Sequence, residues 1–250
     1  MNKKLRLFYI AVHFLTRIPL PLKGDVRQQE IAQSIVYYPL VGALLGVIFF
    51  LISQMIVFMS SDFSNNVLAA ILLTVWVLIT GGLHLDGLAD SADAWIGGLN
   101  NRERTLEIMK DPYCGPIAVA VIVLLLLLKW TALSYLLKTD NAAFLIAVPM
   151  LSRSLILILF MTTLYVRDSG LGSAFFEYLP NEKLLWSVLI ISAISYLILG
   201  SFFSLLLVAI TVIVLRAMMI KRIGGMTGDT LGATVEITEA VALLGLVFSI

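Results

Sequence analysis

Long apolar segments recur along the whole chain, and they constrain the fold more than any other feature. Five or six of them approach the roughly 20 residues that a helix needs to cross a bilayer. They cover residues 37–59, 67–83, 116–137, 142–166, 184–219 and 231–250. The 184–219 segment is too long for one span, and Gly200 and Ser201 near its middle predict two closely connected helices. We therefore predict an all-α, polytopic membrane bundle of about six or seven transmembrane helices, forming a single integral membrane domain over residues 1–250.

The composition agrees with a membrane protein. Hydrophobic residues make up 60% of the chain and charged residues only 13%, about half the usual charged share of a soluble domain. The mean hydropathy is +1.00. These values exclude a soluble globule, a disordered chain and a nucleic-acid-binding domain. The basic N-terminus lacks the small-residue cleavage site of a signal peptide, and Arg17 and Pro19 interrupt its apolar run, so we expect a retained amphipathic or partly embedded helix.

The distribution of basic residues predicts the orientation. With the N-terminus in the cytoplasm and seven spans, Lys138 is the one basic residue on the opposite side, and Lys129 and Arg153 lie within spans. The other fourteen of the 17 Lys and Arg residues fall on the cytoplasmic side: Lys3, Lys4, Arg6, Arg17, Lys23, Arg27, Arg102, Arg104, Lys110, Arg167, Lys183, Arg216, Lys221 and Arg222. Most of the acidic side chains that could carry chemistry lie at the same edge, so we expect the active site to face the cytoplasm.

The densest group of candidate functional residues follows the second apolar segment, in GGLHLDGLADSADA. Asp86, Asp90 and Asp93 are spaced i, i+4, i+7, which places them on one face of a helix. Carboxylates that repel one another near hydrocarbon are costly, and a divalent cation such as Mg²⁺ or Mn²⁺ relieves that cost. We interpret all three as metal ligands and catalytic residues; a solvated helix face just outside the bilayer is the alternative. His84 is either a proton carrier or substrate contact, or a buried hydrogen-bonding side chain.

Two further polar segments are expected on the same side. RERTLEIMKDPYCGP predicts a short amphipathic helix ending before Pro112, with Arg102, Arg104 and Lys110 as candidate phosphate ligands. A surface helix with ordinary ion pairs is equally compatible. KRIGGMTGDTLGATVEITEA places glycines around Asp229 and adds the hydroxyl of Thr227 beside Gly228, which favours contact with an anion. Because Asp229, Glu236 and Glu239 recur at i, i+7, i+10, we predict a second metal or nucleotide contact here; the alternative is a glycine-rich cap and a polar helix start.

Three further basic residues lie outside these polar segments. Arg153 lies in the middle of a predicted span, where a guanidinium must face the bundle interior and an anion, and we predict a role in substrate binding. Lys129 lies among leucines and has either a structural role or a side chain that reaches the interface. Arg17 precedes Pro19, where a helix would stop, and either joins the cytoplasmic site or anchors at lipid headgroups.

Five motifs, in this order along nearly the whole chain, resemble the cobalamin-5′-phosphate synthase family, also called adenosylcobinamide-GDP ribazoletransferases. They are FLTRIP (14–19), YYPLVGALLG (37–46), GGLHLDGLADSADA (81–94), RTLEIMKDPYCGP (104–116) and GGMTGDTLGA (224–233). The combination of HLDGLADSADA with GDTLGA downstream is specific. The family is similar to CDP-alcohol phosphotransferases, but here Asp86-Gly87-Leu88-Ala89 is followed by Asp90 where their acidic motif has Arg, so their metal roles do not transfer directly.

The resemblance implies a late step of coenzyme B12 assembly. The 5′-hydroxyl side of α-ribazole, or of its 5′-phosphate, attacks the phosphorus attached to cobinamide in adenosylcobinamide-GDP, and GMP leaves. It further implies a requirement for Mg²⁺ and a location in the cytoplasmic (inner) membrane. The expected ligands are Asp86, Asp90 and Asp93 for metal, with Asp229 on the same or a second ion, and Arg104 and Lys110 for diphosphate. Expected partners are the two substrates and membrane lipid, without nucleic acid; self-association and contact with other cobalamin-pathway enzymes are left open.

Other classes fit the sequence less well. A proton- or cation-coupled carrier would place its acids near the bilayer midplane between inverted repeats, whereas here they cluster at one edge and no repeat is visible. A non-catalytic scaffold does not need three aspartates in register. The nearest alternative is another Mg²⁺-dependent membrane phosphotransferase of the CDP-alcohol type.

Overall fold

The computed structural model describes residues 2–60, 62–99, 101–139, 142–167 and 181–249, and of residues 181–183 only the backbone. Every regular element in these residues is a helix, as the apolar segments predict. Two details of the predicted topology, the Lys183 side chain and positions 140–141 of the loop after the third apolar segment, lie outside the described residues.

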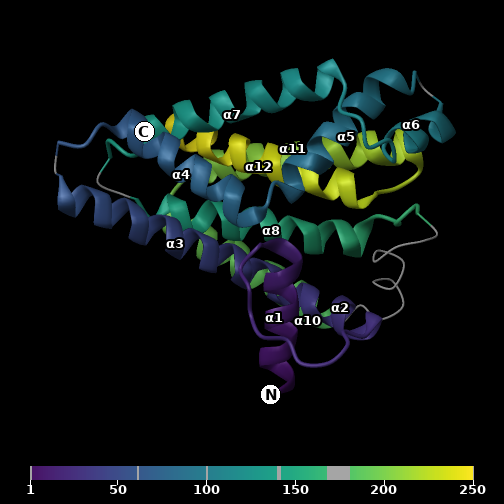
Figure 1. Ribbon diagram of the computed structural model, residues 1–250, viewed down its shortest axis with the longest axis horizontal. Helices are drawn as coiled ribbons and strands as arrows, with labels where there is room; N and C mark the ends of the chain where they lie inside the picture. Colours follow the sequence, from purple (N-terminus) through teal and green to yellow (C-terminus); the bar gives the residue numbers. More distant parts are fainter. Residues whose placement is uncertain (1, 61, 100, 140–141, 168–180, 250) are drawn as a thin grey trace.

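The helices run mainly along one axis, and a smaller group gathers at one end (Figure 1). α3, α4, α7, α8 and α12 follow the long axis, whereas α5 and α6 lie together at one end and α1 and α2 lie beside the bundle. The elements in chain order are α1 (Lys3–Leu15), α2 (Gln28–Ser34), a 3-10 turn (Ile35–Tyr37), α3 (Tyr38–Met59), α4 (Asn65–Thr80), α5 (Leu83–Gly97), α6 (Arg102–Ile108), α7 (Pro116–Leu136), α8 (Phe144–Thr162), α10 (Asn181–Leu199), α11 (Phe202–Ile223) and α12 (Gly228–Val247).

The protein is membrane-integral. In the part of the chain that the structure describes, five helical segments are long and apolar enough to cross a bilayer on their own: 28–59, 116–136, 144–162, 202–223 and 228–247. α4 and α5 reach that criterion only as a pair bent by 87°, which gives up to six spans. The apolar part of α10 described here, Leu184–Leu199, is shorter than a span. The described residues therefore give five spans, or six if the bent pair crosses the bilayer as one broken span, which is the lower end of the predicted six or seven.

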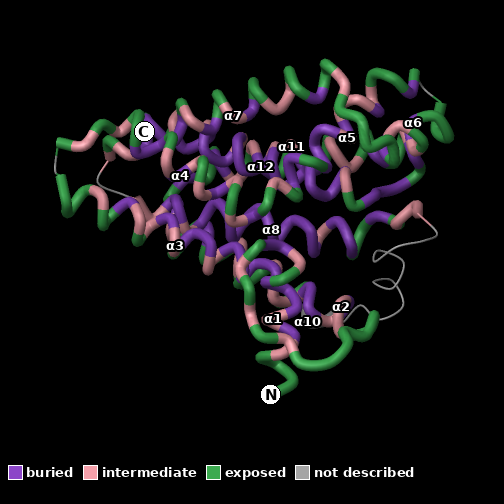
Figure 2. Tube along the Cα trace, viewed as in Figure 1, coloured by how far each residue is buried: buried purple, intermediate pink, exposed green. Residues whose placement is uncertain are grey.

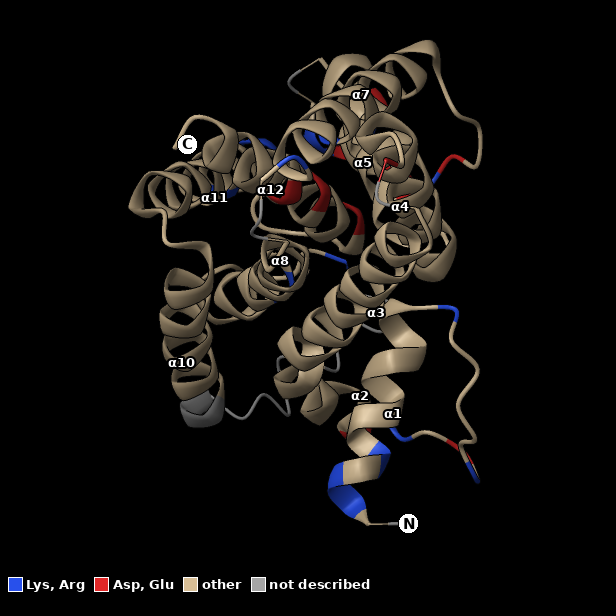
Figure 3. Ribbon diagram, turned by 90° about the vertical axis from the view of Figure 1, so that its left-hand side faces the viewer, with Lys and Arg blue, Asp and Glu red and all other residues tan. Residues whose placement is uncertain are grey.

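Several predicted boundaries are confirmed. α10 ends at Leu199 and α11 begins at Phe202, with Gly200 at a φ of 62° between them, so the long apolar segment is indeed two helices. α1 ends at Leu15, shortly before Pro19. It is amphipathic as predicted, since Leu7, Ile10 and Ala11 are buried while Lys3 and Lys4 are exposed. Figure 3 shows these basic residues near the N-terminus, away from the bundle interior.

The most buried helices are α8 and α12, which lie inside the bundle (Figure 2). α3 packs closely on α8 through two glycines one turn apart. A Cβ atom at Gly42 would lie 2.3 Å from the backbone oxygen of Pro149, and one at Gly46 would lie 2.4 Å from the Cα of Ile146. Small residues at this spacing let helix backbones approach in a membrane, where packing has to replace the hydrophobic effect.

Candidate active site

A sharp break between α4 and α5 positions the aspartate motif. Gly81 and Gly82 have φ values of 64° and 69°, a conformation that side chains other than glycine disfavour. The Arg17 N–H donates to the carbonyl of Ile79 at 2.7 Å, and the Arg17 side chain lies against Gly81. Of the two predicted environments of Arg17, the structure thus places it at the break that turns α5, and it shows no contact between Arg17 and the aspartates.

α5 then packs against the start of α12 through close backbone contact. A Cβ atom at Gly87 would lie 2.7 Å from the carbonyl oxygen of Asp229 and 2.9 Å from its Cα. One turn further along α12, a Cβ at Gly232 would lie 3.2 Å from the Cα of His84. The two most specific sequence motifs, about 140 residues apart, therefore meet at one crossing of helices.

This crossing brings three carboxylates within electrostatic range of one another. Asp90 is half-buried, and the charges acting on it are those of Asp229, Asp86, Arg167 and Asp93. Asp229 is affected in turn by Arg167 and Asp86. Asp86 is exposed. The packing of α5 on α12 thus brings Asp229 close to the α5 aspartates, as predicted.

Asp93 has a different environment from the one predicted. Its two carboxylate oxygens accept hydrogen bonds from the backbone N–H groups of Gly115, at 2.6 Å, and Ala118, at 2.9 Å. These groups belong to the start of α7, where the first N–H groups of a helix lack partners within the helix. The carboxylate thereby fixes the start of α7 on α5. Its role as a metal ligand stays a prediction, with both oxygens already engaged.

We expect Asp93→Ala to act mainly on stability. Loss of a helix-capping carboxylate costs about 1 kcal/mol, which corresponds to a fall of about 2–4 °C in the thermal midpoint for a chain of this size. A thermal-shift measurement in detergent, run beside an activity assay, checks this expectation. An unchanged midpoint together with complete loss of activity would instead assign Asp93 to the metal site.

Arg167 is a site residue that the sequence analysis did not identify. Its Nη2 donates to Asp229 Oδ2 at 2.5 Å and to the carbonyl of Met109 at 3.4 Å. A backbone clamp places it there, because Val166 N donates to Met226 O and Met226 N donates to Leu164 O. The Arg167 Nε is buried and has no hydrogen-bond partner among the described residues. The only signal in the sequence was a basic residue at the end of an apolar segment.

Tyr165 lies beside this clamp. Burial raises the pKa of its hydroxyl, and the nearby Arg167 guanidinium opposes that rise. The Tyr165 hydroxyl is also the side-chain atom nearest to the open side of Gly228. A neutral, half-buried phenol therefore borders the start of α12 at ordinary pH.

The predicted anion contacts at Thr227 and Gly228 are used partly for capping. Thr227 Oγ1 accepts from the backbone of Thr230 at 3.3 Å, and Thr230 Oγ1 accepts from the backbone of Thr227 at 2.9 Å. Thr227 is buried, whereas Gly228 is exposed. The cap explains the polar start of α12, and contact of these two residues with substrate stays a prediction.

The predicted phosphate ligands Arg104, on α6, and Lys110, just after it, are not part of the cluster of Asp86, Asp90 and Asp229. Arg104 forms an exposed ion pair with Glu107 at 2.8 Å, so it follows the alternative interpretation of a surface helix. Lys110 is exposed as well. α6 is nevertheless held close to α11, since Arg102 Nε donates to the carbonyl of Ile223 and Arg222 Nε donates to Thr105 Oγ1.

The other two acids of α12 serve a separate ion network. Lys129 Nζ lies 2.6 Å from Glu236 Oε2 and 2.5 Å from Glu239 Oε2, and Arg153 Nη1 pairs with Glu239 Oε1. The prediction that Arg153 faces the interior and an anion is confirmed. The expectation that Glu236 and Glu239 join Asp229 at a metal or nucleotide was wrong, because basic residues of α7 and α8 already neutralise them. Arg153 is fully buried in this network, and its predicted role in substrate binding stays a prediction.

His84 belongs to the interior and not to the carboxylate face. It is buried against Gly232, and the charges around it are those of Arg153, Glu239 and Lys129. Its Nδ1 has no hydrogen-bond partner among the described residues. Of the two predicted environments, the buried side chain is the one observed, although without the expected hydrogen bond at Nδ1.

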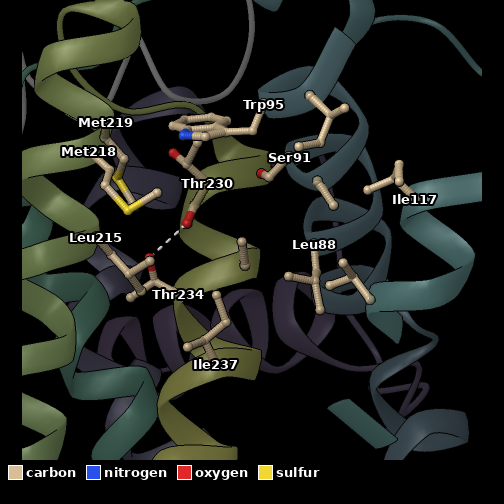
Figure 4. A pocket seen from close by; sticks show the side chains of 14 residues that line it. Leu88, Ser91, Trp95, Ile117, Leu215, Met218, Met219, Thr230, Thr234 and Ile237 are labelled. Carbon is tan, nitrogen blue, oxygen red and sulfur yellow. Dashed lines mark hydrogen bonds between the residues drawn. The ribbon is translucent and has the colours of Figure 1, made fainter. Parts of the chain in front are cut away.

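The opposite face of α5 borders an apolar cavity of about 280 Å³ (Figure 4). Leu88, Ser91 and Trp95 line it from α5, and Thr230 and Thr234 line it from α12. Since these α5 residues lie on the helix face away from Asp86 and Asp90, the cavity lies on the opposite side of α5 from these carboxylates.

The carboxylates fit a hard cation that arrives with a phosphate substrate. Within the described ranges, no group of three or more His, Cys, Asp or Glu side chains is arranged to hold a metal ion. Mg²⁺, however, commonly binds one or two carboxylates and completes its shell with water and substrate phosphates. Asp86, Asp90 and Asp229 provide such an incomplete set of oxygen ligands.

Comparison with known proteins identifies the family. The model of the cobalamin-5-phosphate synthase family matches residues 7–247. The chain belongs to this family. An adenosylcobinamide-GDP ribazoletransferase of Pseudomonas fluorescens (strain SBW25) is 48% identical, with 96% of this chain and 98% of that protein covered. One of Pseudomonas putida (strain GB-1) is also 48% identical, with 96% and 97% covered. No solved structure matches.

Four of the five sequence motifs meet at or beside α5, which itself contains most of the third motif. Arg17 of the first motif lies at the α4–α5 break, Gly115 of the fourth contacts Asp93, and Asp229 of the fifth contacts Gly87. The second motif contains Gly42 and Gly46, which pack α3 against α8. Residues far apart in this sequence therefore build and support the carboxylate cluster.

Proposed function

We propose that this chain is an adenosylcobinamide-GDP ribazoletransferase, which joins α-ribazole or its 5′-phosphate to the cobinamide phosphate and releases GMP. The observation that carries the proposal is the crossing of α5 and α12, where Asp86, Asp90 and Asp229 meet beside Arg167. Family membership over residues 7–247 and the names of relatives covered almost completely support the same activity.

The chemistry of the acceptors corrects the expectation that the 5′-hydroxyl is the nucleophile. α-Ribazole 5′-phosphate carries no free 5′-hydroxyl, so a hydroxyl that both acceptors share is one on the ribose ring. Its oxygen forms a bond to the phosphorus attached to cobinamide, the bond to the bridging oxygen breaks, and GMP takes the leaving electron pair. The hydroxyl proton passes to a base, which we place at Asp86 or Asp90 because His84 is buried away from this face.

The charged side chains have separate roles in this proposal. Asp229, together with whichever of Asp86 and Asp90 does not act as the base, would hold Mg²⁺, which would supply charge neutralisation on the diphosphate. Arg167 provides a planar donor beside Asp229, with its Nε–H unpartnered in the described part of the chain. A guanidinium in this position suits a phosphate oxygen, so we propose that Arg167, instead of Arg104, contacts the diphosphate.

A turnover assay tests the function directly. Purified protein receives adenosylcobinamide-GDP and α-ribazole, with Mg²⁺ or with EDTA, and GMP and corrinoid product are followed. We expect GMP release that requires both the acceptor and Mg²⁺. Folded protein that forms no product, but releases CMP from a CDP-alcohol and an acceptor alcohol, would favour the alternative phosphotransferase. Activity that survives EDTA would remove the metal from the proposal.

We further propose that the protein lies in the inner membrane with this site facing the cytoplasm, as the distribution of basic residues favours. Cys114 is the one cysteine of the chain and is exposed next to the site. A membrane-impermeant maleimide should therefore label it in inside-out vesicles and not in spheroplasts. Lys138→Cys in a Cys114→Ser background, at an exposed residue predicted on the other side, should show the reverse. The opposite labelling pattern would invert the topology.

A further inference from the structure

A network of ion pairs lies buried inside the bundle, where removing charged side chains from water costs free energy. Lys129 of α7, Arg153 of α8, and Glu236 and Glu239 of α12 balance in charge, and all four are almost completely buried. Lys129 also lies over the ring of Trp76, at 5.2 Å from its centroid. Figure 3 shows acidic residues of α12 inside the bundle, surrounded by helices with uncharged outer faces.

Stability alone does not explain this network. Buried ion pairs are often replaced by packed apolar residues without loss of stability, because desolvation offsets their attraction. Here the desolvation is not fully offset, since Nε and Nη2 of Arg153 have no hydrogen-bond partner among the described residues. The best-supported use of such groups elsewhere is to fix the register of packed elements.

The geometry of α12 links this register to the site. Glu236 follows Asp229 by seven residues, which is almost two full helical turns, so both lie on nearly the same side of α12 about 10 Å apart along the axis. A rotation or slip of α12 that broke the contact between Lys129 and Glu236 would therefore also move the Asp229 carboxylate.

α7 completes the connection to the other side of the site. Near its start, Gly115 and Ala118 are held by Asp93 of α5, and further along Lys129 holds α12. Asp93 and Lys129 thus attach the two helices that carry the catalytic carboxylates to one rigid helix.

We infer that the Lys129–Glu236–Glu239–Arg153 network is a positioning element for the transfer reaction: it sets the register of α12 so that Asp229 meets Asp86 and Asp90. The inference rests on the proposed function, because its effect is on that reaction. Lys129 and Glu236 are positioning residues here and do not contact substrate.

The charge-balanced double variant Lys129→Met/Glu236→Leu tests this role. It removes one cation and one anion and leaves the pair of Arg153 with Glu239. We expect a thermal midpoint within a few degrees of wild type and KM values for both substrates within twofold, but a kcat at least tenfold lower. The matched control is Arg6→Met/Glu30→Leu, which removes an ion pair between α1 and α2 at 2.7 Å, far from α12 in the fold; its kcat should stay within twofold.

Each outcome decides the inference. If the double variant keeps kcat within twofold of wild type at an unchanged thermal midpoint, or loses kcat only in proportion to its loss of folded protein, the network only satisfies its own charges. If the apolar pair does not fold, Lys129→Gln/Glu236→Gln keeps polar contacts and is judged by the same criteria; failure of both to fold would make the network a folding requirement and overturn the positioning role. Absence of product with wild-type enzyme would remove the proposed function, and this inference with it.

Discussion

Replacing Asp90 with asparagine is expected to lower kcat about a thousand-fold while the protein stays folded in the membrane. Asp90 is half-buried, and the charges of Asp86, Asp229 and Arg167 act on it. These residues come from α5, from α12 and from the segment after α8. The loss of Asp90 removes a carboxylate that would either hold the proposed Mg²⁺, whose positive charge would neutralise the diphosphate, or accept the hydroxyl proton. A thousand-fold effect corresponds to about 4 kcal/mol of activation free energy, within the range that electrostatic groups contribute in active sites.

The measurement is single-variant kinetics with a charge control. Glu103→Gln removes an exposed carboxylate from the nearby helix α6 and should keep kcat within twofold. Thermal midpoints of both variants, measured in the same detergent, separate catalysis from folding. If Asp90→Asn retained more than a tenth of the wild-type kcat at an unchanged midpoint, the carboxylate cluster could not be the centre of the reaction.

Replacing Gly87 with valine is expected to lower kcat/KM at least a hundred-fold through displacement alone. Its Cβ would meet the carbonyl oxygen and Cα of Asp229 at 2.7 and 2.9 Å. These are backbone atoms of a buried helix, so α5 and α12 have to separate to make room. A displacement of about 1 Å in a catalytic group can cost a hundred-fold in rate, and here the displacement falls on Asp229 itself.

The control for this variant lies on the same helix. Ala92→Val adds side-chain carbon toward the apolar cavity that Ala92 lines, so it meets open space and should leave kcat/KM within twofold. Helical content measured by circular dichroism should remain near wild type in both. Normal activity of Gly87→Val would mean that the close crossing of α5 and α12 does not hold in the active protein.

Features with a local cause were predictable. Leu184–Met219 is too long and apolar for one span, and glycine with serine in its middle ends a helix, so the split between α10 and α11 could be placed. The spacing of Asp86, Asp90 and Asp93 defines one helix face whatever the tertiary structure. A guanidinium in hydrocarbon requires an anion, which is why Arg153 was expected to face inward before its partner was known.

Features that depend on which helices touch were not predictable. α4 ends at Thr80, and the 87° bend that follows makes one predicted span a broken one. Asp93 shares its helix face with Asp86 and Asp90, yet the start of α7 engages it. Glu236 and Glu239 share a face with Asp229, yet they form ion pairs with basic residues of two other helices.

The membrane-embedded helical fold, the family and the carboxylate-rich segments follow from the amino-acid sequence, because hydropathy, helical period and motif are properties of neighbouring residues. The partners of the charged residues depend instead on how distant helices pack. Arg167 meets Asp229 across 62 positions, Arg153 meets Glu239 across 86, and Lys129 meets Glu236 across 107. Helical period places a side chain on a face, but the packing of distant helices decides what that face meets, and close glycine contacts such as Gly87 on Asp229 fix this packing.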